Sequence, residues 1–350
     1  MTEQLKRITD KLVSYCSLSL EEYEALIKNR DAETYGFLQK KALELRHNIY
    51  GNRIFIRGLI EISNFCKNDC YYCGIRKSNK NCSRYRLTVE EILSCCENGY
   101  KLGFRTFVLQ GGEDAYYTDD LLSSLINEIK ICYPDCAVTL SLGERSKESY
   151  QRLFDAGADR YLLRHETADA EHYSRLHPDK LSLENRIECL QNLKNIGFQT
   201  GCGMMVGSPY QNEKTLAKDL KFIEEFQPDM CGIGPFIPHK DTKFADEKCG
   251  DVGLTCFLLA VVRIIKPDIL LPATTALGVV APEGKKEGIL ASANVVMPNL
   301  SPLNVRDKYE LYNNKYNPDS ETVERLEKLK KEVSSIGYEI VCDRGDIIKL

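Results

Sequence analysis

IFIRGLIEISNFCKNDCYYC, residues 54–73, is the stretch that decides the fold of this 350-residue chain. The run 54–62 is short, apolar and rich in β-forming residues, which predicts a buried strand. A polar loop follows at once and carries Cys66, Cys70 and Cys73. A strand that presents unusual side chains at its carboxyl end is typical of parallel α/β folds, whose active sites lie at that end.

Seven similar apolar runs follow, with helical patterns between them. Strands are predicted over 54–62, 104–110, 136–142, 159–165, 198–206, 230–237, 269–275 and 293–297. Helices are predicted over 88–101, 119–132, 147–156, 183–195 and 213–226. This alternation indicates βαβ units and a parallel sheet, and eight strands favour closure into a (β/α)8 TIM barrel. An open doubly wound sheet is the alternative.

We expect a single domain over residues 1–350. Helical periodicity and the lack of a strand signal predict a helical N-terminal cap over 1–50. The barrel is expected over 51–302. Within the C-terminal helical segment, 303–350, residues 321–336 predict an amphipathic helix that covers the barrel.

The amino-acid composition disfavours two classes of protein, those that bind nucleic acid and those that span a membrane. A hydrophobic content of 43% with 28% charged residues is ordinary for a globular protein. A net charge of -4 makes nucleic acid an unfavourable main partner, and no apolar stretch is long enough to span a membrane. The 15 cysteines are expected to be mostly reduced, buried side chains, so we predict a cytoplasmic protein with a small substrate.

Cys66, Cys70 and Cys73 can bring three thiolates to one centre from one short loop. Thiolates favour zinc, copper(I) or iron–sulfur clusters over hard cations. A structural zinc site is closed by four ligands, and the next cysteine, Cys82, lies nine residues further on. Three ligands for a four-iron cluster leave one iron open to a substrate. An iron–sulfur cluster is therefore favoured, and zinc is the alternative.

The predicted strand 159–165, DRYLLRH, carries charges in a buried pattern. Because side chains alternate along a strand, Arg160, Arg164 and Glu166 share one face and His165 lies on the other. The first face is predicted to point into the barrel, where charges are costly unless they are paired or bind a ligand. An Arg164–Glu166 ion pair is one interpretation, and an anion site is the other. The hydroxyl groups predicted to orient a small polar ligand opposite it are those of Thr139, Thr274 and Thr275.

The CxxxCxxC spacing after the first strand, with an aromatic residue before the last cysteine, resembles the radical S-adenosylmethionine (SAM) superfamily. The resemblance implies that the three cysteines hold a [4Fe–4S] cluster whose open iron binds the amine and carboxylate of SAM. One-electron reduction would then cleave SAM to a 5'-deoxyadenosyl radical. It also implies that Tyr72 packs near adenine. Gly111, Gly112 and Glu113 resemble the superfamily's GGE segment, which contacts the methionyl ammonium group.

A closer resemblance covers roughly residues 50 to 312. VTLSLGE, AGADRYLLRHETA, GIGPFIPHKDT, PATTALG and ANVVMPN are together similar to the HydE family, the radical SAM maturases of [FeFe]-hydrogenase in the biotin synthase-like branch. The residues that this resemblance assigns to SAM are Glu166, Arg186 and Met205. Those that it assigns to a substrate cavity are Thr139, Arg160, Arg164, Thr274 and Thr275, with Tyr309 and Tyr312 closing the cavity bottom.

The resemblance implies a role in maturation of the hydrogenase H-cluster. The implied substrate is an iron–cysteine complex bearing carbon monoxide and cyanide, supplied by a sister radical enzyme. Transient contacts with other maturation proteins and an electron donor would follow. A methylornithine synthase or biotin-synthase-like enzyme, acting on an amino-acid or thiol-containing substrate, is the nearest alternative, and an iron–sulfur sensor or carrier is the non-enzymatic one. Because Cys342 is the sole cysteine after Pro298, we predict no second cluster.

Overall fold

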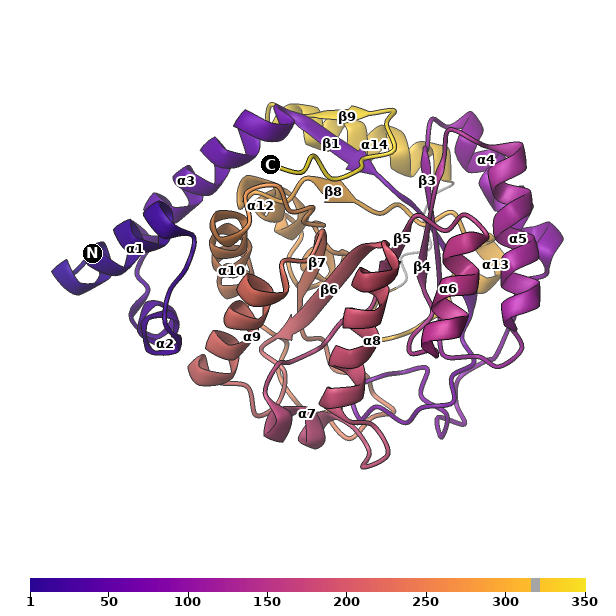
Figure 1. Ribbon diagram of the computed structural model, residues 1–350, viewed down its shortest axis with the longest axis horizontal. Helices are drawn as coiled ribbons and strands as arrows, with labels where there is room; N and C mark the ends of the chain where they lie inside the picture. The colour runs from indigo at the N-terminus through magenta and orange to yellow at the C-terminus, as the bar shows by residue number, and fades with distance from the viewer. Residues whose placement is uncertain (316–321) are drawn as a thin grey trace.

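Parallel strands lie in the middle of the fold and helices surround them (Figure 1). The computed structural model describes residues 1–315 and 322–350. The strands are β1 (Arg53–Ile56), β2 (Gly58–Ser63), β3 (Thr106–Gly111), β4 (Ala137–Ser141), β5 (Arg160–Leu162), β6 (Gln199–Val206), β7 (Met230–Pro235), β8 (Val295–Val296) and β9 (Glu339–Val341). The helices are α1 (Glu3–Tyr15), α2 (Leu20–Asn29), α3 (Ala32–Tyr50), α4 (Val89–Lys101), α5 (Asp119–Cys132), α6 (Lys147–Asp155), α7 (Ala170–Leu176), α8 (Leu183–Ile196), α9 (Glu213–Phe226), α10 (Val252–Ile265), α11 (Thr275–Val280), α12 (Gly284–Leu290), α13 (Leu303–Arg306) and α14 (Thr322–Ser335).

The strands form two parallel sheets. The larger sheet has the order β2-β3-β4-β5-β6-β7, and the smaller one has the order β8-β1-β9. Single parallel bridges continue from β7 through the segment near residue 270 to β8 and on to β2: Met230↔Leu270, Pro272↔Val295 and Leu59↔Asn299. The predicted α/β class with a parallel sheet is therefore confirmed.

Two strand predictions need correction. The run 54–62 is two strands, because the chain leaves the sheet geometry at Arg57 and β1 and β2 then pair with different neighbours. Segment 269–275 makes isolated bridges and no strand among the described residues. Pro272, in its middle, has no N–H to give to a ladder. The short strand β9, which pairs with β1, was not predicted.

The predicted helices agree closely with the structure because their start signals are local. Thr88 caps α4 and forms a capping box with Glu91, and Thr118 caps α5. The observed bounds of α5 and α9 are the predicted ones. The covering helix is α14, which buries Leu326 and Val333; the predicted first residue, Glu321, lies outside the described residues.

The N-terminal helices α1–α3 lie at one side of the molecule (Figure 1). Helix α2 packs on α9 and helix α3 packs on α10, so this segment thickens the helix layer. The last residue of α3, Tyr50, also packs with Phe55, Leu162 and Met230 of the strands. Among the described residues no helix has both the length and the apolar character that a bilayer crossing requires.

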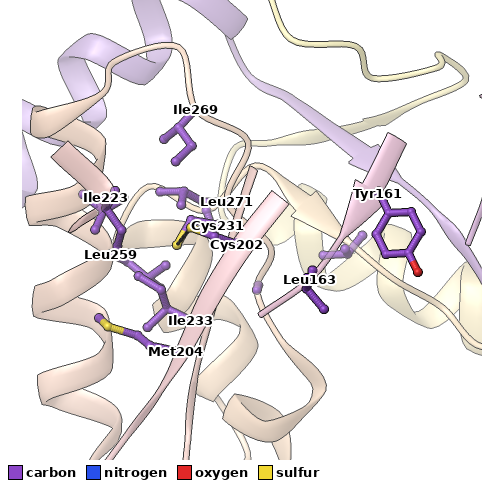
Figure 2. Close-up of a cluster of buried hydrophobic side chains, with 14 of the residues drawn as sticks. Tyr161, Leu163, Cys202, Met204, Ile223, Cys231, Ile233, Leu259, Ile269 and Leu271 are labelled. Atoms are coloured by element: carbon purple, nitrogen blue, oxygen red, sulfur yellow. Dashed lines mark hydrogen bonds between the residues drawn. The ribbon is translucent and has the colours of Figure 1, made fainter. Parts of the chain in front are cut away.

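Strands β6 and β7 separate an apolar outer face from a glycine-rich inner face. Outward side chains such as Cys202 and Ile233 pack with Ile223 of α9 and Leu259 of α10 (Figure 2). Cys202 and Cys231 are free, buried thiols with sulfurs 3.8 Å apart. All 15 cysteines are free, as predicted, but seven of them are buried, which is fewer than the expected majority. The residues of the opposite, inward face include Gly201, Gly203, Gly232 and Gly234. Met205 and Met230 share this face, and a Cβ at Gly201, Gly203 or Gly234 would clash with a neighbouring atom. Of the four glycines, Gly232 alone adjoins open space.

Candidate active site at the carboxyl end of the strands

The loop between β2 and α4 is held by its own polar side chains. Asn64 donates from Nδ2 to the carbonyl oxygens of Ser83 (2.8 Å) and Lys308 (2.7 Å). It also accepts the N–H of Tyr85 at 2.8 Å. Arg84 donates to four carbonyl oxygens of the same loop. These bonds fix the path of the segment that carries the predicted cluster ligands.

Cys66, Cys70 and Cys73 are half-buried free thiols on this loop. Burial raises the pKa of all three thiols, and raises that of Cys73 to about 12. The nearby thiols of Cys73 and Cys66 raise the pKa of Cys70 further. The three thiols are thus neighbours, although no group of three or more potential metal-binding side chains within 1–315 and 322–350 stands in ligand geometry. Their role as cluster ligands stays a prediction.

The predicted GGE segment packs directly on this loop. An added Cβ at Gly112 would lie 2.2 Å from the carbonyl oxygen of Phe65 and 2.7 Å from Cβ of Cys66. Such distances exclude any side chain, so glycine is required for the close approach. Gly111 ends β3, next to the carbonyl oxygen of Ser63.

Glu113 follows Gly112, and one oxygen of its carboxylate already accepts a hydrogen bond. Its Oε1 accepts the N–H of Glu144 at 3.0 Å. Its Oε2 lies 2.9 Å from Nζ of Lys67, yet it makes no hydrogen bond of good geometry. This oxygen is available to a cationic group of a ligand.

Charged groups gather just after β5. Glu166 has a φ of 65°, a left-handed conformation that is uncommon for non-glycine residues. Nη2 of Arg164 lies 3.0 Å from Oε2 of Glu166, but both atoms lack a hydrogen bond of good geometry. Arg186 of α8 donates from Nη1 to the carbonyl oxygen of Arg164 at 2.7 Å and pairs with Glu144 at 2.5 Å. The structure thus brings Arg164, Glu166 and Arg186 together and leaves the first two able to bind a ligand.

An aromatic and apolar wall lies beside these charges. The members of this wall are Leu176, Met205, Phe236 and Phe244, with Tyr71 and Tyr72 packed against them. The hydroxyl of Tyr72 lies 3.1 Å from Nε2 of His177, and the two rings meet edge to face. Burial lowers the pKa of His177 to about 3, so the imidazole is neutral. Tyr72 and Met205 therefore offer a flat apolar surface next to the cysteine loop.

The next polar groups of the site are the buried hydroxyls of two threonines. Thr139 is 1% exposed, and its hydroxyl and that of Thr274 have no hydrogen-bond partner among the residues that the structure describes. Thr274 lies against β7, where a Cβ at Gly234 would be 2.7 Å from its hydroxyl oxygen. A Cβ at Gly232 would meet no atom within 3.9 Å although this glycine is buried. A hollow with unsatisfied hydroxyls fits a polar ligand, because burying such groups without partners is unfavourable. Thr275 begins α11 and lines a separate cavity of about 1040 Å³, whose lining includes residues of α14 and none of Thr139, Thr274 and Gly232.

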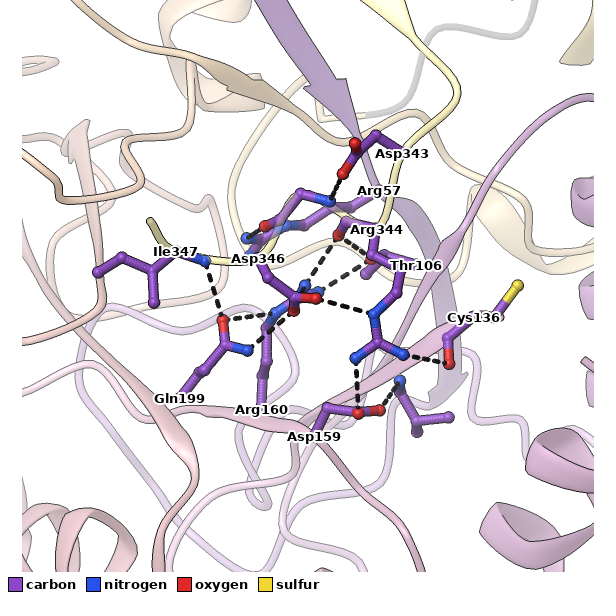
Figure 3. Close-up of polar contacts among 12 residues, drawn as sticks. Arg57, Thr106, Cys136, Asp159, Arg160, Gln199, Asp343, Arg344, Asp346 and Ile347 are labelled. Carbon is purple, nitrogen blue, oxygen red and sulfur yellow. Dashed lines mark hydrogen bonds and ion pairs between the residues drawn. The ribbon is translucent and has the colours of Figure 1, made fainter. Parts of the chain in front are cut away.

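Arg160 lies lower still, and here the structure differs from the expected substrate contact. Its guanidinium donates to Thr106 (2.9 Å) and to the carbonyl oxygen of Arg344 (2.8 Å), and pairs with Asp346 at 2.5 Å (Figure 3). Arg57, fully buried beside it, donates to the carbonyl oxygen of Gly345. The segment 343–347 thus closes the floor under the strands, and we call it the floor segment.

Tyr309 and Tyr312 are the tyrosines predicted to close the cavity bottom. The pKa of Tyr309 is raised by burial, then by nearby Glu61, with smaller effects from Cys73 and Cys66. Burial and Glu61 also raise the pKa of Tyr312, against a lowering by Arg164. Gln110 of β3 donates from Nε2 to the Tyr309 hydroxyl at 3.4 Å, which places Tyr309 near the carboxyl end of β3. That the two tyrosines close the cavity bottom stays a prediction.

Sequence reasoning missed several residues of this region. Glu144 had a signal, since it is an acid in the loop after a strand. Arg57 also had a sequence signal, because it is a charged residue inside an apolar run. His177 and the floor residue Asp346 had none, because distant chain segments create their surroundings.

Comparisons with known proteins agree with this geometry. Residues 60–223 match the model of the radical SAM superfamily. The [FeFe] hydrogenase maturase subunit HydE of Thermotoga maritima is 49% identical over 275 residues, which cover 79% of this chain and 78% of that protein. A 3-methylornithine synthase of Methanosarcina acetivorans is 28% identical over 301 residues, covering 84% and 83%. The crystal structure of a methylornithine synthase superposes with a TM-score of 0.82 over 95% of this chain and 97% of that one, at 23% identity, which supports the fold alone.

The higher identity to the maturase over most of both chains decides between the two enzyme families that the sequence left open. The chain belongs to the radical SAM superfamily and, within it, to the HydE family of [FeFe]-hydrogenase maturases.

Proposed function

We propose that the chain binds a [4Fe–4S] cluster through Cys66, Cys70 and Cys73, binds SAM beside it, and acts on a small substrate in the hollow below. As a member of the HydE family it is a radical SAM enzyme of [FeFe]-hydrogenase maturation. The observation that carries the proposal is a set of buried polar atoms next to the cysteine loop that make no hydrogen bond of good geometry within the described residues, although some are ion-paired; the set includes atoms of Glu113, Arg164 and Glu166. This set suits SAM, a ligand with an ammonium, a carboxylate and ribose hydroxyls.

When bound, the cluster and SAM together supply a one-electron reductive cleavage of SAM. The chain's own residues bind SAM and orient it. Gly111 and Gly112 let the backbone approach closely, and Glu113 neutralises the methionyl ammonium. Glu166 accepts hydrogen bonds from ligand hydroxyls.

The remaining SAM contacts are a charge and an apolar wall. Arg186, whose pKa is raised by nearby Tyr173 and Glu144 against the opposing effect of burial, stays charged and attracts a carboxylate. Tyr72 and Met205 pack against adenine and keep water away from it.

The substrate is proposed to lie against Arg164, Thr139 and Thr274, whose free donors suit an anionic or strongly polar group. Thr275, Tyr309 and Tyr312 complete the proposed contacts. An iron–cysteine complex with carbonyl and cyanide ligands combines these features, and the open space at Gly232 of β7 would give it room. Arg160, expected from the family resemblance to contact substrate, would do so only after the floor segment releases it.

The architecture is proposed to be a closed (β/α)8 barrel over 51–302, flanked by 1–50 and 303–350 in one domain. The parallel bridges that lead from β7 through residue 270 and β8 to β2 support closure. Transient contacts with an electron donor and other maturation proteins, in the cytoplasm, complete the proposal.

The test is electron paramagnetic resonance on the anaerobically reconstituted, reduced protein, with and without SAM. A cubane signal that changes on adding SAM would support SAM binding at the open iron. A signal that ignores SAM would favour an iron–sulfur sensor or carrier. Cys70→Ala is expected to abolish SAM cleavage, and 5'-deoxyadenosine formation at the wild-type rate would contradict the ligand assignment.

A further inference from the structure

Tyr173, on α7, was not among the residues predicted from the sequence. Its side chain is buried, with 1% of the residue exposed. Its hydroxyl is also buried and has no hydrogen-bond partner among the described residues. An unpaired buried hydroxyl is unfavourable in a folded protein and calls for a partner that the chain itself does not supply.

The ring of Tyr173 is held firmly, so its hydroxyl points in a fixed direction. It stacks on His177 with ring centroids 3.9 Å apart and an interplanar angle of 22°. Nδ1 of His177 lies 2.9 Å from the carbonyl oxygen of Tyr173. A carbonyl only accepts, so Nδ1 carries the proton, and Nε2 accepts the hydroxyl hydrogen of Tyr72 at 3.1 Å. The three rings form one packed unit.

The surroundings of the hydroxyl identify the space that it faces. The N–H of Tyr71 donates to the carbonyl oxygen of Leu176 at 2.9 Å, which ties α7 to the cysteine loop. Burial raises the pKa of Tyr173 most, and the nearby groups that also affect this pKa are Arg186, Glu144, Cys70 and Glu166. Arg186 is bound to Glu144 and to the carbonyl oxygen of Arg164. The Tyr173 hydroxyl is therefore close both to a cysteine of the predicted cluster and to the arginine predicted to contact SAM.

We propose that the hydroxyl of Tyr173 donates a hydrogen bond to the methionyl carboxylate of SAM, next to Arg186. This inference rests on the proposed function and adds a binding residue to it. The carboxylate is the part of SAM that belongs beside the open iron, near Cys70, and it accepts hydrogen bonds without donating any. Adenine is assigned to the wall made by Tyr72 and Met205, and the ribose hydroxyls to Glu166, so neither needs this donor.

Tyr173→Phe is the variant that tests the proposal, because phenylalanine keeps the ring stacked on His177. The measurement is the affinity of cluster-loaded protein, by anaerobic calorimetry, for two probes. S-adenosylhomocysteine retains the carboxylate, and 5'-methylthioadenosine lacks it. We expect binding of the first probe to weaken about tenfold, equivalent to about 1.4 kcal/mol, while binding of the second changes less than about twofold.

Tyr23→Phe is the matched control, since Tyr23 is equally buried but donates to Glu224 far from the site. It should leave both affinities unchanged. An unchanged affinity of Tyr173→Phe for S-adenosylhomocysteine would overturn the proposal and assign the hydroxyl to an ordered water. Equal weakening for both probes would also overturn it, by placing the contact on the adenosine half. Failure of the wild-type protein to bind either probe would instead contradict the proposed function.

Discussion

Replacing Asp346 by asparagine removes the carboxylate that neutralises the floor under the strands. Asp346 pairs with Arg160 at 2.5 Å, and the two side chains are 39% and 1% exposed. Breaking a fully buried ion pair costs about 3–5 kcal/mol, whereas an exposed pair contributes about 0.2–1 kcal/mol. Because Arg160 is fully buried and Asp346 is partly solvated, we expect Asp346→Asn to lower the free energy of unfolding by about 2 kcal/mol.

Urea unfolding at neutral pH measures this loss, since urea does not screen charges as guanidinium does. Asp120→Asn is the control, because Asp120 also pairs with an arginine, Arg152, but the two side chains are 87% and 52% exposed. We expect it to change stability by less than about 0.5 kcal/mol. Equal effects of the two variants would refute the claim that the floor segment neutralises Arg160.

The pH dependence gives a second check on Asp346. Burial alone would raise the pKa of its carboxyl, but the hydrogen bond from Arg344 and the charge of Arg160 outweigh burial and hold the pKa well below its usual range. A carboxyl whose pKa is lower in the folded state stabilises the fold at neutral pH, and this contribution is lost as pH falls below the unfolded value of about 4. Wild-type protein and Asp346→Asn should therefore begin to converge in stability below about pH 4 and converge fully only below the lowered pKa of the folded state.

Three further changes test the proposed site. Gly232→Val should fill the hollow under the proposed SAM site. Activation of apo-[FeFe]-hydrogenase should therefore fall at least about tenfold, while SAM cleavage persists. Gly36→Ala is the control, because Gly36 is exposed and a Cβ there would meet no atom within 4 Å. Gly112→Ala should force the GGE segment off the cysteine loop, lowering bound iron per protein, and full iron loading would contradict the packing argument. Arg164→Ala should weaken substrate binding by about 1.5–3 kcal/mol. SAM affinity should stay nearly intact, because Arg186 is held by the backbone carbonyl oxygen of residue 164, which the substitution keeps. A parallel loss of SAM affinity would assign Arg164 to the SAM site.

Local signals explain what could be predicted from the sequence. The alternation of apolar and charged residues around Arg160 and Arg164 placed both on the inner face, and the structure packs Tyr161 and Leu163 outward as expected (Figure 2). Helix starts were predictable because a cap residue and its partner lie three positions apart.

The parts that could not be predicted depend on distant contacts. Arg160 and Asp346 are 186 positions apart, and no local pattern announces their pairing. The partner of Tyr72, His177, is 105 positions away. Nor does a sequence show which buried hydroxyls lack a partner, as those of Thr139 and Tyr173 do, because that depends on every neighbour at once.

The floor segment also constrains the order in which the chain can assemble. Strands β2 to β8 lie between residues 58 and 296, so all of them leave the ribosome before residues 343–347 are made. Until then Arg160 lacks its ion pair with Asp346 and Arg57 lacks the carbonyl oxygen of Gly345, so water must solvate both guanidinium groups. Closing so long a loop is among the slow steps of folding. A nascent chain would therefore pass through a stage with the SAM end already formed and the opposite end still hydrated, which makes that end the natural place for chaperones or proteases to act on incomplete molecules.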